Sequence, residues 1–502
     1  MNNLLPIANG EKIKRSDLPH LPFDDFRDTL LNFTENGGSV VHYFAYEDDI
    51  RLKLLAVLRD DKSLYVCGSD VFVEYPAMTA VTEKFHMFER EIAEQYGIKF
   101  FGHPWLRMVR YHENYSGRED VFGNDYSQDI PGNYKYFAVE GDVIHEVAVG
   151  PVHAGIIEPG QFRFNCIGEI VLHLEIQLGY QHRGAEKLLR TVEAQRLPII
   201  IEGITGDSAV CNSLCFSQAI ESLAGLKVDM GASIIRTIAL ELERLSNHVG
   251  DLGALSGDVA FNPPAAFFGR MRGEFLNLLL ILSGNRFGKT LVRPGGVSGS
   301  LDDGVRQIIV DKIKEIKPQL RHVCDLLFSA HTVRARFENT GVVKTEIAEK
   351  IGLVGYAGRA SGLNYDARRT FPTECYASLK PNINTHKNGD VFCRAHVRND
   401  EIMHSLDLIE DLLARDVAGQ SAEVEEFALA PSSFVVTVNE GWRGELSHCL
   451  LTGEEGEIIH YKVKDPSFHN WTGLAMSLRD QQISDFPLCN KSFNLSYCGF
   501  DL

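Results

Sequence analysis

Two neighbouring stretches of the sequence are the most informative about the fold. They are HEVAVGPVHAGIIEPGQFRF at residues 145–164 and LEIQLGYQHRGAEKLL at residues 174–189. The first opens in a valine-rich segment, residues 143–149, that is typical of a strand. Beyond the second, apolar residues recur at helical spacing over long segments. Three such segments span residues 233–255, 267–282 and 305–328. The sequence therefore predicts a large, mainly helical domain from residue 138 to residue 502.

The part of the chain before these stretches alternates between strand and helix patterns. Residues 39–46 and 52–58 are rich in Val, Leu, Tyr and Phe, as strands are. Residues 83–96 carry apolar side chains at helical spacing, and Gly97 follows as a stop signal. Residues 113–137 are mostly polar and predict a linker. We expect an α+β protein with a small, α/β-sandwich-like domain at residues 1–112.

Composition limits the possible partners and the location. The 502 residues carry a formal charge of −18, which argues against nucleic acid and anionic lipid as direct partners. No apolar run approaches the roughly 20 residues that a membrane-spanning helix needs. The first residues lack the order of a secretion signal, so we expect the cytoplasm. None of the ten cysteines forms a C-x-x-C pair, which predicts reduced, mostly buried thiols.

Further motifs extend from the two stretches almost to the end of the chain. They are LELERLSNHVGDLG at 240–253, GRASGLNYDARR at 358–369, GDVFCRAHVRNDE at 389–401, EGWRGELSHCLLTG at 440–453 and YKVKDPSFHNW at 461–471. With them the chain resembles the large subunit of membrane-bound (group 4, energy-converting) nickel–iron hydrogenases, in particular hydrogenase-4 component G-like proteins without the metal-binding cysteines. It also resembles the quinone-site subunit of respiratory complex I. Upstream, FEREIAEQYGIKFFGHPWLR at 88–107 resembles the 30-kDa subunit of complex I.

The resemblance also locates the positions of the metal ligands. In the hydrogenases two C-x-x-C pairs hold nickel and iron, because soft thiolates bind and bridge these metals. Aligned on the element Arg183-Gly184-Ala185-Glu186, the first pair falls on Thr205 and Ser208, and the second falls on Ser467 and Asn470. Hydroxyls and an amide are poor ligands for nickel or low-spin iron. Cys211 and Cys215 lie one or two helical turns beyond, and two thiolates are too few. We therefore expect no metal and no cofactor in this chain.

Compared with complex I, this chain lacks the side chains that donate hydrogen bonds to the quinone. The first histidine of the relevant loop corresponds to His153, whereas the second falls near Ile157 or Glu158. The tyrosine position falls on Gly206. Quinone reduction by the mechanism of complex I therefore lacks both of its donor side chains in this sequence.

Acidic and imidazole side chains remain as candidates for proton transfer. The resemblance matches Glu186 to the glutamate that relays protons in the hydrogenases, and Asp465 to the acidic residue of the second motif. We expect His153, His182 and Asp207 to cluster near them, where partial burial shifts pKa values. The structural alternative stays open: Glu186 and Arg183 form a buried ion pair, and His182 is a satisfied core histidine.

Two arginine-containing elements are interpreted as structural. The first holds Arg359, Asp366, Arg368 and Arg369, which predict an ion-pair network between domains; an interface to an iron–sulfur partner is the alternative. The second is the Arg293-Pro294-Gly295-Gly296 segment, which predicts a tight turn. It lacks the order of a phosphate-binding loop, and we expect no nucleotide.

The resemblance implies a peripheral subunit of a complex I-like, energy-converting oxidoreductase on the cytoplasmic side of the inner (plasma) membrane. Its implied partners are an iron–sulfur small subunit, which carries the cluster, and membrane subunits of antiporter and anchor type. Electron transport, with a quinone-like acceptor, would be coupled to proton or ion translocation. The alternatives are a non-catalytic scaffold and, third, a working hydrogenase. The sequence leaves the electron donor, the acceptor and the ion open, and no activity is expected of the chain alone.

Overall fold

The computed structural model describes residues 3–48, 51–123, 136–153, 157–415 and 427–502. Its N-terminal part is a β-sheet with strand order β1 (Leu5–Ile7), β6 (Leu64–Asp70), β5 (Arg51–Arg59) and β4 (Ser39–Asp48), and β3 (His20–Leu21) pairs with β6. Helices α1 (Phe23–Glu35) and α2 (His86–Tyr96) pack on β4. The apolar residues of α1 recur at helical spacing, so Phe26 and Leu30 are buried on one face of the helix.

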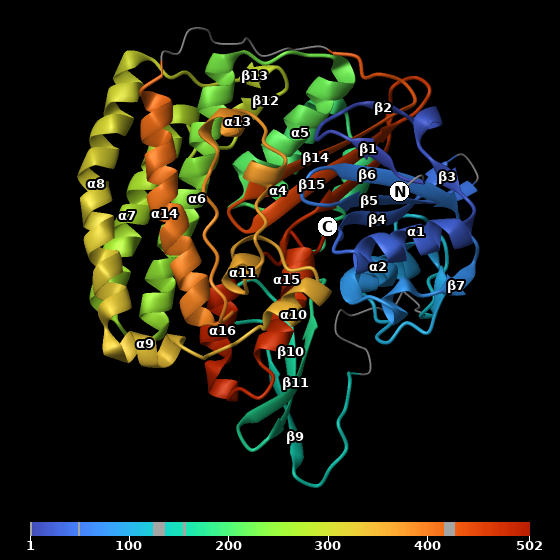
Figure 1. Cartoon of the computed structure of the whole chain (residues 1–502), viewed down its shortest axis with the longest axis horizontal. Coiled ribbons are helices and arrows are strands. Elements are labelled where there is room, and N and C mark those ends of the chain that lie inside the picture. The colour runs from blue at the N-terminus through green and yellow to red at the C-terminus, as the bar shows by residue number, and fades with distance from the viewer. Residues whose placement is uncertain (1–2, 49–50, 124–135, 154–156, 416–426) are drawn as a thin grey trace.

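Four long helices form the opposite side of the molecule, at the left in Figure 1. Helix α6 (Met230–Asp258) packs against α7 (Asn262–Ser283) and α14 (Val391–Leu413), and α8 (Asp303–Ser329) packs against α7 and α14. Aspartate side chains cap three of these helices: Asp229, Asp302 and Asp390 each accept a backbone N–H of the first turn. Most residues of α6 are buried.

A second sheet lies between the N-terminal part and the helices. Its order is β16 (Ile458–Lys464), β15 (Gly444–Thr452), β14 (Ser433–Gly441) and β2 (Ile13–Lys14). All residues of β14 and β15 are buried because both faces are covered. Val436 and Val438 pack into a cluster with the N-terminal sheet, while Val435 packs on the other face with residues of α5 (Ala209–Ala224).

A third sheet, β11 (Ile170–Gln177), β10 (Gln161–Ile167) and β9 (Ile144–Val149), extends away from the body at the bottom of Figure 1. The other helices are α3 (Ala185–Thr191), α4 (Leu197–Ile204), α9 (His331–Phe337), α10 (Thr345–Lys350), α11 (Gly355–Ala360), α12 (Ala367–Thr370), α13 (Tyr376–Leu379), α15 (Ser467–Ser477) and α16 (Phe486–Phe493). Two further strand pairs are β7 (Glu74–Pro76) with β8 (Lys99–Phe101), and β12 (Val292–Arg293) with β13 (Gly296–Val297).

These elements confirm the predicted α+β fold. Helices α6, α7 and α8 contain the three long segments predicted as helical, and β4, β5 and β9 match the predicted strands. The tight turn at Pro294-Gly295 joins β12 to β13. The cysteines are all free thiols, and only Cys498 is partly exposed. Much of the predicted linker, residues 124–135, lies outside the described residues. Among the described helices, none is long and apolar enough to cross a membrane.

Candidate functional site

The four positions matched to metal ligands lie at the ends of three helices. Thr205 directly follows the last residue of α4, and Ser208 precedes the first residue of α5. Ser467 and Asn470 lie in the first turn of α15. All four residues are at most 3% exposed, so their polar atoms need partners inside the protein.

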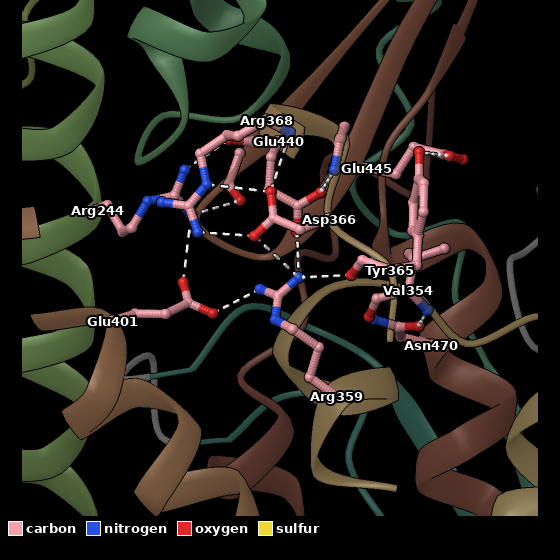
Figure 2. A network of polar contacts seen from close by, with 12 residues as sticks. Arg244, Val354, Arg359, Tyr365, Asp366, Arg368, Glu401, Glu440, Glu445 and Asn470 are labelled. Carbon is pink, nitrogen blue, oxygen red and sulfur yellow. Dashed lines mark hydrogen bonds and ion pairs between the residues drawn. The ribbon is translucent and has the colours of Figure 1, made fainter. Parts of the chain in front are cut away.

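All four of these side chains make hydrogen bonds within the protein. The hydroxyl of Ser208 donates to Oδ1 of Asp207 at 3.5 Å. The hydroxyl of Thr205 donates to Oδ2 of Asp465 at 3.3 Å. Oγ of Ser467 accepts the backbone N–H of Ser496 at 2.9 Å. The amide of Asn470 both donates to and accepts from the backbone of Val354, at 3.1 Å each way (Figure 2). These polar atoms therefore stabilise the local structure.

A charged cluster lies beside these positions. Trp442 and Arg443 form the two-residue turn between β14 and β15. The guanidinium of Arg443 donates to both carboxylate oxygens of Asp207, at 2.6 and 2.8 Å, and to the carbonyl of Asn494 at 2.7 Å. Burial alone would lower the pKa of Arg443, but Asp207 and Asp465 raise it above its ordinary value. Arg443 is therefore a fixed cation in this cluster.

Asp465 completes the cluster. It precedes α15, and its Oδ1 accepts the backbone N–H of Ser467 at 2.8 Å. Burial raises the pKa of Asp465, and the nearby charge of Arg443 offsets part of that rise. A Cβ atom at Gly499 would lie 2.6 Å from both Oδ2 of Asp465 and the hydroxyl of Thr205, so glycine is required for this close approach.

The donor set at the four matched positions does not fit a nickel–iron cluster. Hydroxyl and amide groups are hard, neutral donors, and the cluster needs bridging thiolates. Cys211 and Cys215 lie within the first two turns of α5, where a hydrogen bond with Cys215, together with burial, keeps the pKa of Cys211 far above its ordinary value. Among the described residues no group of three or more His, Cys, Asp or Glu is arranged to hold a metal ion.

Glu186 lies in a different charged group, and the ion pair with Arg183 that the structural alternative offered does not form. Its cation is Lys462 at 3.0 Å, and its Oε1 also accepts the backbone N–H of Val463 at 3.0 Å. Lys462 also pairs with Glu91 of α2, at 2.6 Å. Arg183 does not pair with Glu186, because it donates to the carbonyls of Gly203 and Ile204.

The predicted cluster of candidate proton carriers forms only in part. Asp207 and Asp465 lie around Arg443, as described above. His182 instead contacts the hydroxyl of Tyr115 at 3.3 Å and the carbonyl of Asp501 at 3.3 Å. Burial lowers the pKa of His182 to about 3, so it is a neutral, half-buried imidazole. His153 contacts the carbonyl of Gly160 at 3.0 Å.

Arg359 and Arg368 form the predicted network of ion pairs, and the network is buried. Arg359 pairs with Glu401 and Glu440 (Figure 2). Arg368 pairs with Asp366 and Glu241. Arg244 also lies between Glu241 and Glu401. Arg369 is exposed and outside the network. The buried members of this group therefore connect α6, α14 and β14 within the large domain, so the structural interpretation holds but the predicted position between domains was wrong.

Several charged residues of these groups were not predicted from the sequence. Arg443, Glu440 and Glu445 all belong to the stretch EGWRGEL, whose charge pattern is visible in the sequence but whose partners are not. Lys462 and Glu91 give no comparable signal, because their carboxylate and ammonium partners come from distant parts of the chain.

Comparisons with known proteins agree with this architecture. Residues 34–127 match the family described as "Respiratory-chain NADH dehydrogenase, 30 Kd subunit". Residues 258–431 match the family described as "Respiratory-chain NADH dehydrogenase, 49 Kd subunit". The chain therefore joins a 30-kDa-like region and a 49-kDa-like region of the complex I type in one polypeptide.

Individual relatives come from both complex I and hydrogenases. "Formate hydrogenlyase subunit 5" of Escherichia coli (strain K12) is 28% identical over 85% of this chain and 77% of its own length. "Membrane-bound hydrogenase subunit alpha" of Pyrococcus furiosus is 28% identical over 70% of this chain and 85% of its own. The C/D subunit of the NADH-quinone oxidoreductase of Phocaeicola vulgatus is 26% identical over 78% and 79%. The chain is thus distantly similar to subunits of formate hydrogenlyase, of a membrane-bound hydrogenase and of NADH-quinone oxidoreductase.

Proposed function

We propose that this chain is the peripheral large subunit of a complex I-like, energy-converting membrane oxidoreductase that has lost the nickel–iron centre. An iron–sulfur small subunit supplies the electrons, and antiporter-like and anchor subunits lie in the membrane. The chain supplies a proton link between electron transfer and ion translocation. The relatives support this assembly, because each of the three is named as a subunit.

The observation that carries the proposal is the charged cluster around Arg443. The positions matched to the four thiolates hold Thr205, Ser208, Ser467 and Asn470. The ionisable groups there are the guanidinium of Arg443 and the carboxyl groups of Asp207 and Asp465. A protein cation balances the acidic side chains, so this site requires no metal ion for charge compensation.

Glu186, Lys462 and Glu91 are proposed as the proton link. The three side chains form a continuous, buried series from α3 through β16 to α2. A carboxylate that shares an ammonium group with a second carboxylate can pass a proton with little movement of the backbone. The electron acceptor is proposed to be a quinone-like molecule that binds differently from quinone in complex I, because Gly206 offers no hydroxyl.

The first test is co-purification of the assembly. The chain, tagged and expressed in its native host, is extracted from membranes with a mild detergent. We expect an iron–sulfur subunit and integral membrane subunits in stoichiometric amounts. Recovery of the tagged chain only in the soluble fraction, without these subunits, would refute the proposed assembly.

The second test is the substitution Glu186→Gln in the whole complex. The side chain of glutamine still accepts the N–H of Val463, but it cannot take up and release a proton. Proton translocation should therefore fall at least tenfold. Reconstituted vesicles are assayed with reduced methyl viologen as donor and a short-chain quinone as acceptor. The matched control is Glu202→Gln, because Glu202 likewise accepts a backbone N–H, from Thr290, and pairs with one cation, Arg293.

A scaffold without a catalytic role is the second candidate function. It is favoured by the fact that Glu186 has structural partners, the N–H of Val463 and the ammonium of Lys462. Under this alternative, Glu186→Gln and Glu202→Gln leave translocation equally unchanged. The paired variants therefore separate the two functions.

A further inference from the structure

A cavity of about 380 Å³ lies between the N-terminal part of the chain and the helical part. Its walls come from α2, the loop at residues 103–111, β11 and α15. Its volume is within the range of small-molecule binding sites. None of the residues of the Arg443 and Glu186 groups lines it, so the cavity is separate from the proton link proposed above.

Aromatic and thioether side chains form part of the walls, together with aliphatic residues. Trp105 and Trp471 line the cavity from opposite parts of the sequence, and Phe500 joins them. Met87, Met108 and Met476 add flexible apolar surface. Flat aromatic molecules pack well against such walls, because ring stacking and sulfur contacts add to the burial of apolar surface.

The charged side chains at the cavity balance each other. Two arginines and two glutamates line it, and the guanidinium of Arg90 donates to the carbonyls of Arg107 and Met108. Glu175 accepts the backbone N–H of Phe137 at 2.7 Å. With no net charge in its lining, the cavity does not favour an ionic ligand.

Three histidines line the cavity, and all are neutral. Burial lowers the pKa of His86 to about 3 and that of His103 to about 4, and it also lowers the pKa of His173. His86 contacts Thr472, and His103 contacts the carbonyl of His86, so both imidazoles have partners.

His173 differs from the other two histidines. Its Nε2 is buried and has no hydrogen-bond partner among the described residues. Its ring packs on Trp105, with centroids 5.6 Å apart. A buried polar atom without a partner is costly, and a ligand with one hydrogen-bonding group would satisfy it.

We propose that this cavity binds an uncharged, flat aromatic molecule whose hydroxyl or carbonyl oxygen forms a hydrogen bond with Nε2 of His173. The ring lies between Trp105 and Trp471. The site joins the 30-kDa-like region to β11 and α15, so an occupant contacts both sides.

The test is isothermal titration of the full chain with 2-naphthol, and with naphthalene-2-sulfonate as the charged analogue. We expect saturable binding of 2-naphthol that quenches tryptophan fluorescence, because two of the three tryptophans line the cavity. We expect the sulfonate to bind at least tenfold more weakly. Absence of saturable binding, or equal affinity for the two probes, overturns the proposal.

Two variants locate the bound molecule. Ala475→Phe fills the cavity from α15 and should weaken binding of 2-naphthol at least tenfold, whereas Leu280→Phe, at an exposed position of α7, should leave it unchanged. His173→Phe removes the polar atom and keeps an aromatic ring. It should weaken the binding of 2-naphthol about tenfold but leave the binding of naphthalene, which has no hydroxyl, unchanged. Unchanged affinity in Ala475→Phe, with the native circular dichroism spectrum retained, would place the ligand elsewhere.

Discussion

At the scale of single residues, Arg443 has the most unusual position. It occupies a two-residue turn, yet its side chain is only 5% exposed. A buried guanidinium is stable there because Asp207 binds it through two hydrogen bonds and Asn494 supplies a third acceptor. The same residue also supplies the positive charge of the proposed metal-free site.

The substitution Arg443→Met should destabilise the chain strongly. It leaves Asp207, whose side chain is 33% exposed, and the buried Asp465 without the nearby cation, and loss of hydrogen bonds to a charged group costs about 1.5–3 kcal/mol. The midpoint of urea unfolding measures the effect. Arg479→Met, at an exposed arginine, should change the midpoint little. A similar midpoint for the two variants would show that Arg443 is not needed for charge balance.

Glu89 should make the stability depend on pH. Burial raises the pKa of Glu89 to about 7, although Met78 and Thr79 donate hydrogen bonds to it. Because the folded state then binds the proton more tightly than the unfolded state, this residue should lower stability as pH rises from about 4.5 to about 7, by about 1.4 kcal/mol per unit. In Glu89→Gln the fall of the thermal midpoint between pH 5 and pH 7 should be smaller. An identical fall in both proteins would contradict the raised pKa.

At the scale of elements, the hairpin of β14 and β15 positions the candidate site. Its tip carries Arg443, and the backbone of Gly444 has a φ of +136°. A Cβ atom at Gly444 would lie 2.6 Å from Cα of Gly355. Only glycine therefore allows the tip to approach α11 this closely.

Gly444→Ala should displace the tip of the hairpin. It should lower the free energy of unfolding by several times what an ordinary Gly→Ala substitution changes it. We expect a clear loss of thermal stability and faster amide exchange at the turn. Gly273→Ala is the matched control: Gly273 is helical, and nothing lies within 4 Å of its added Cβ, so it should stabilise α7 by about 0.5–1 kcal/mol. Equal effects of the two substitutions would argue against the close approach.

The elements also show which features the sequence could predict. The long helices α6, α7 and α8 were predictable, because an apolar repeat over many turns distinguishes helix from strand. The pairing of β2 with β14 was not, because a two-residue strand has no repeat to detect. For Glu186 the sequence suggested Arg183, a near neighbour, whereas its partner Lys462 is 276 positions away. Ion pairs between distant segments depend on tertiary packing, which local patterns do not encode.

At the scale of the whole molecule, the N-terminal part and the helical part are interlocked. β2 extends the sheet of β14, and Lys462 of β16 pairs with Glu91 of α2. Arg59 of β5 pairs with Glu445 at 2.7 Å, and Glu445 also binds Lys464. The N-terminal part therefore supports the hairpin that carries Arg443.

Arg59→Met should make the hairpin of β14 and β15 more mobile, although Arg59 lies in β5, outside the hairpin. Glu445 keeps Lys464 but loses its second cation, and the contact of Arg59 with the ring of Tyr365 is also lost. We expect faster hydrogen exchange of the amides at residues 441–445 without loss of the native fold. Exchange at these amides that matches the unmodified chain would show that the two parts do not support each other.

The most direct measurement is the nickel content of the purified complex, taken together with its uptake of hydrogen gas. Because the site presents hydroxyls, an amide and a fixed guanidinium in place of thiolates, we expect substoichiometric nickel and no hydrogen uptake, with iron present only in the partner subunit. Stoichiometric nickel in this chain together with hydrogen uptake would contradict the loss of the metal centre.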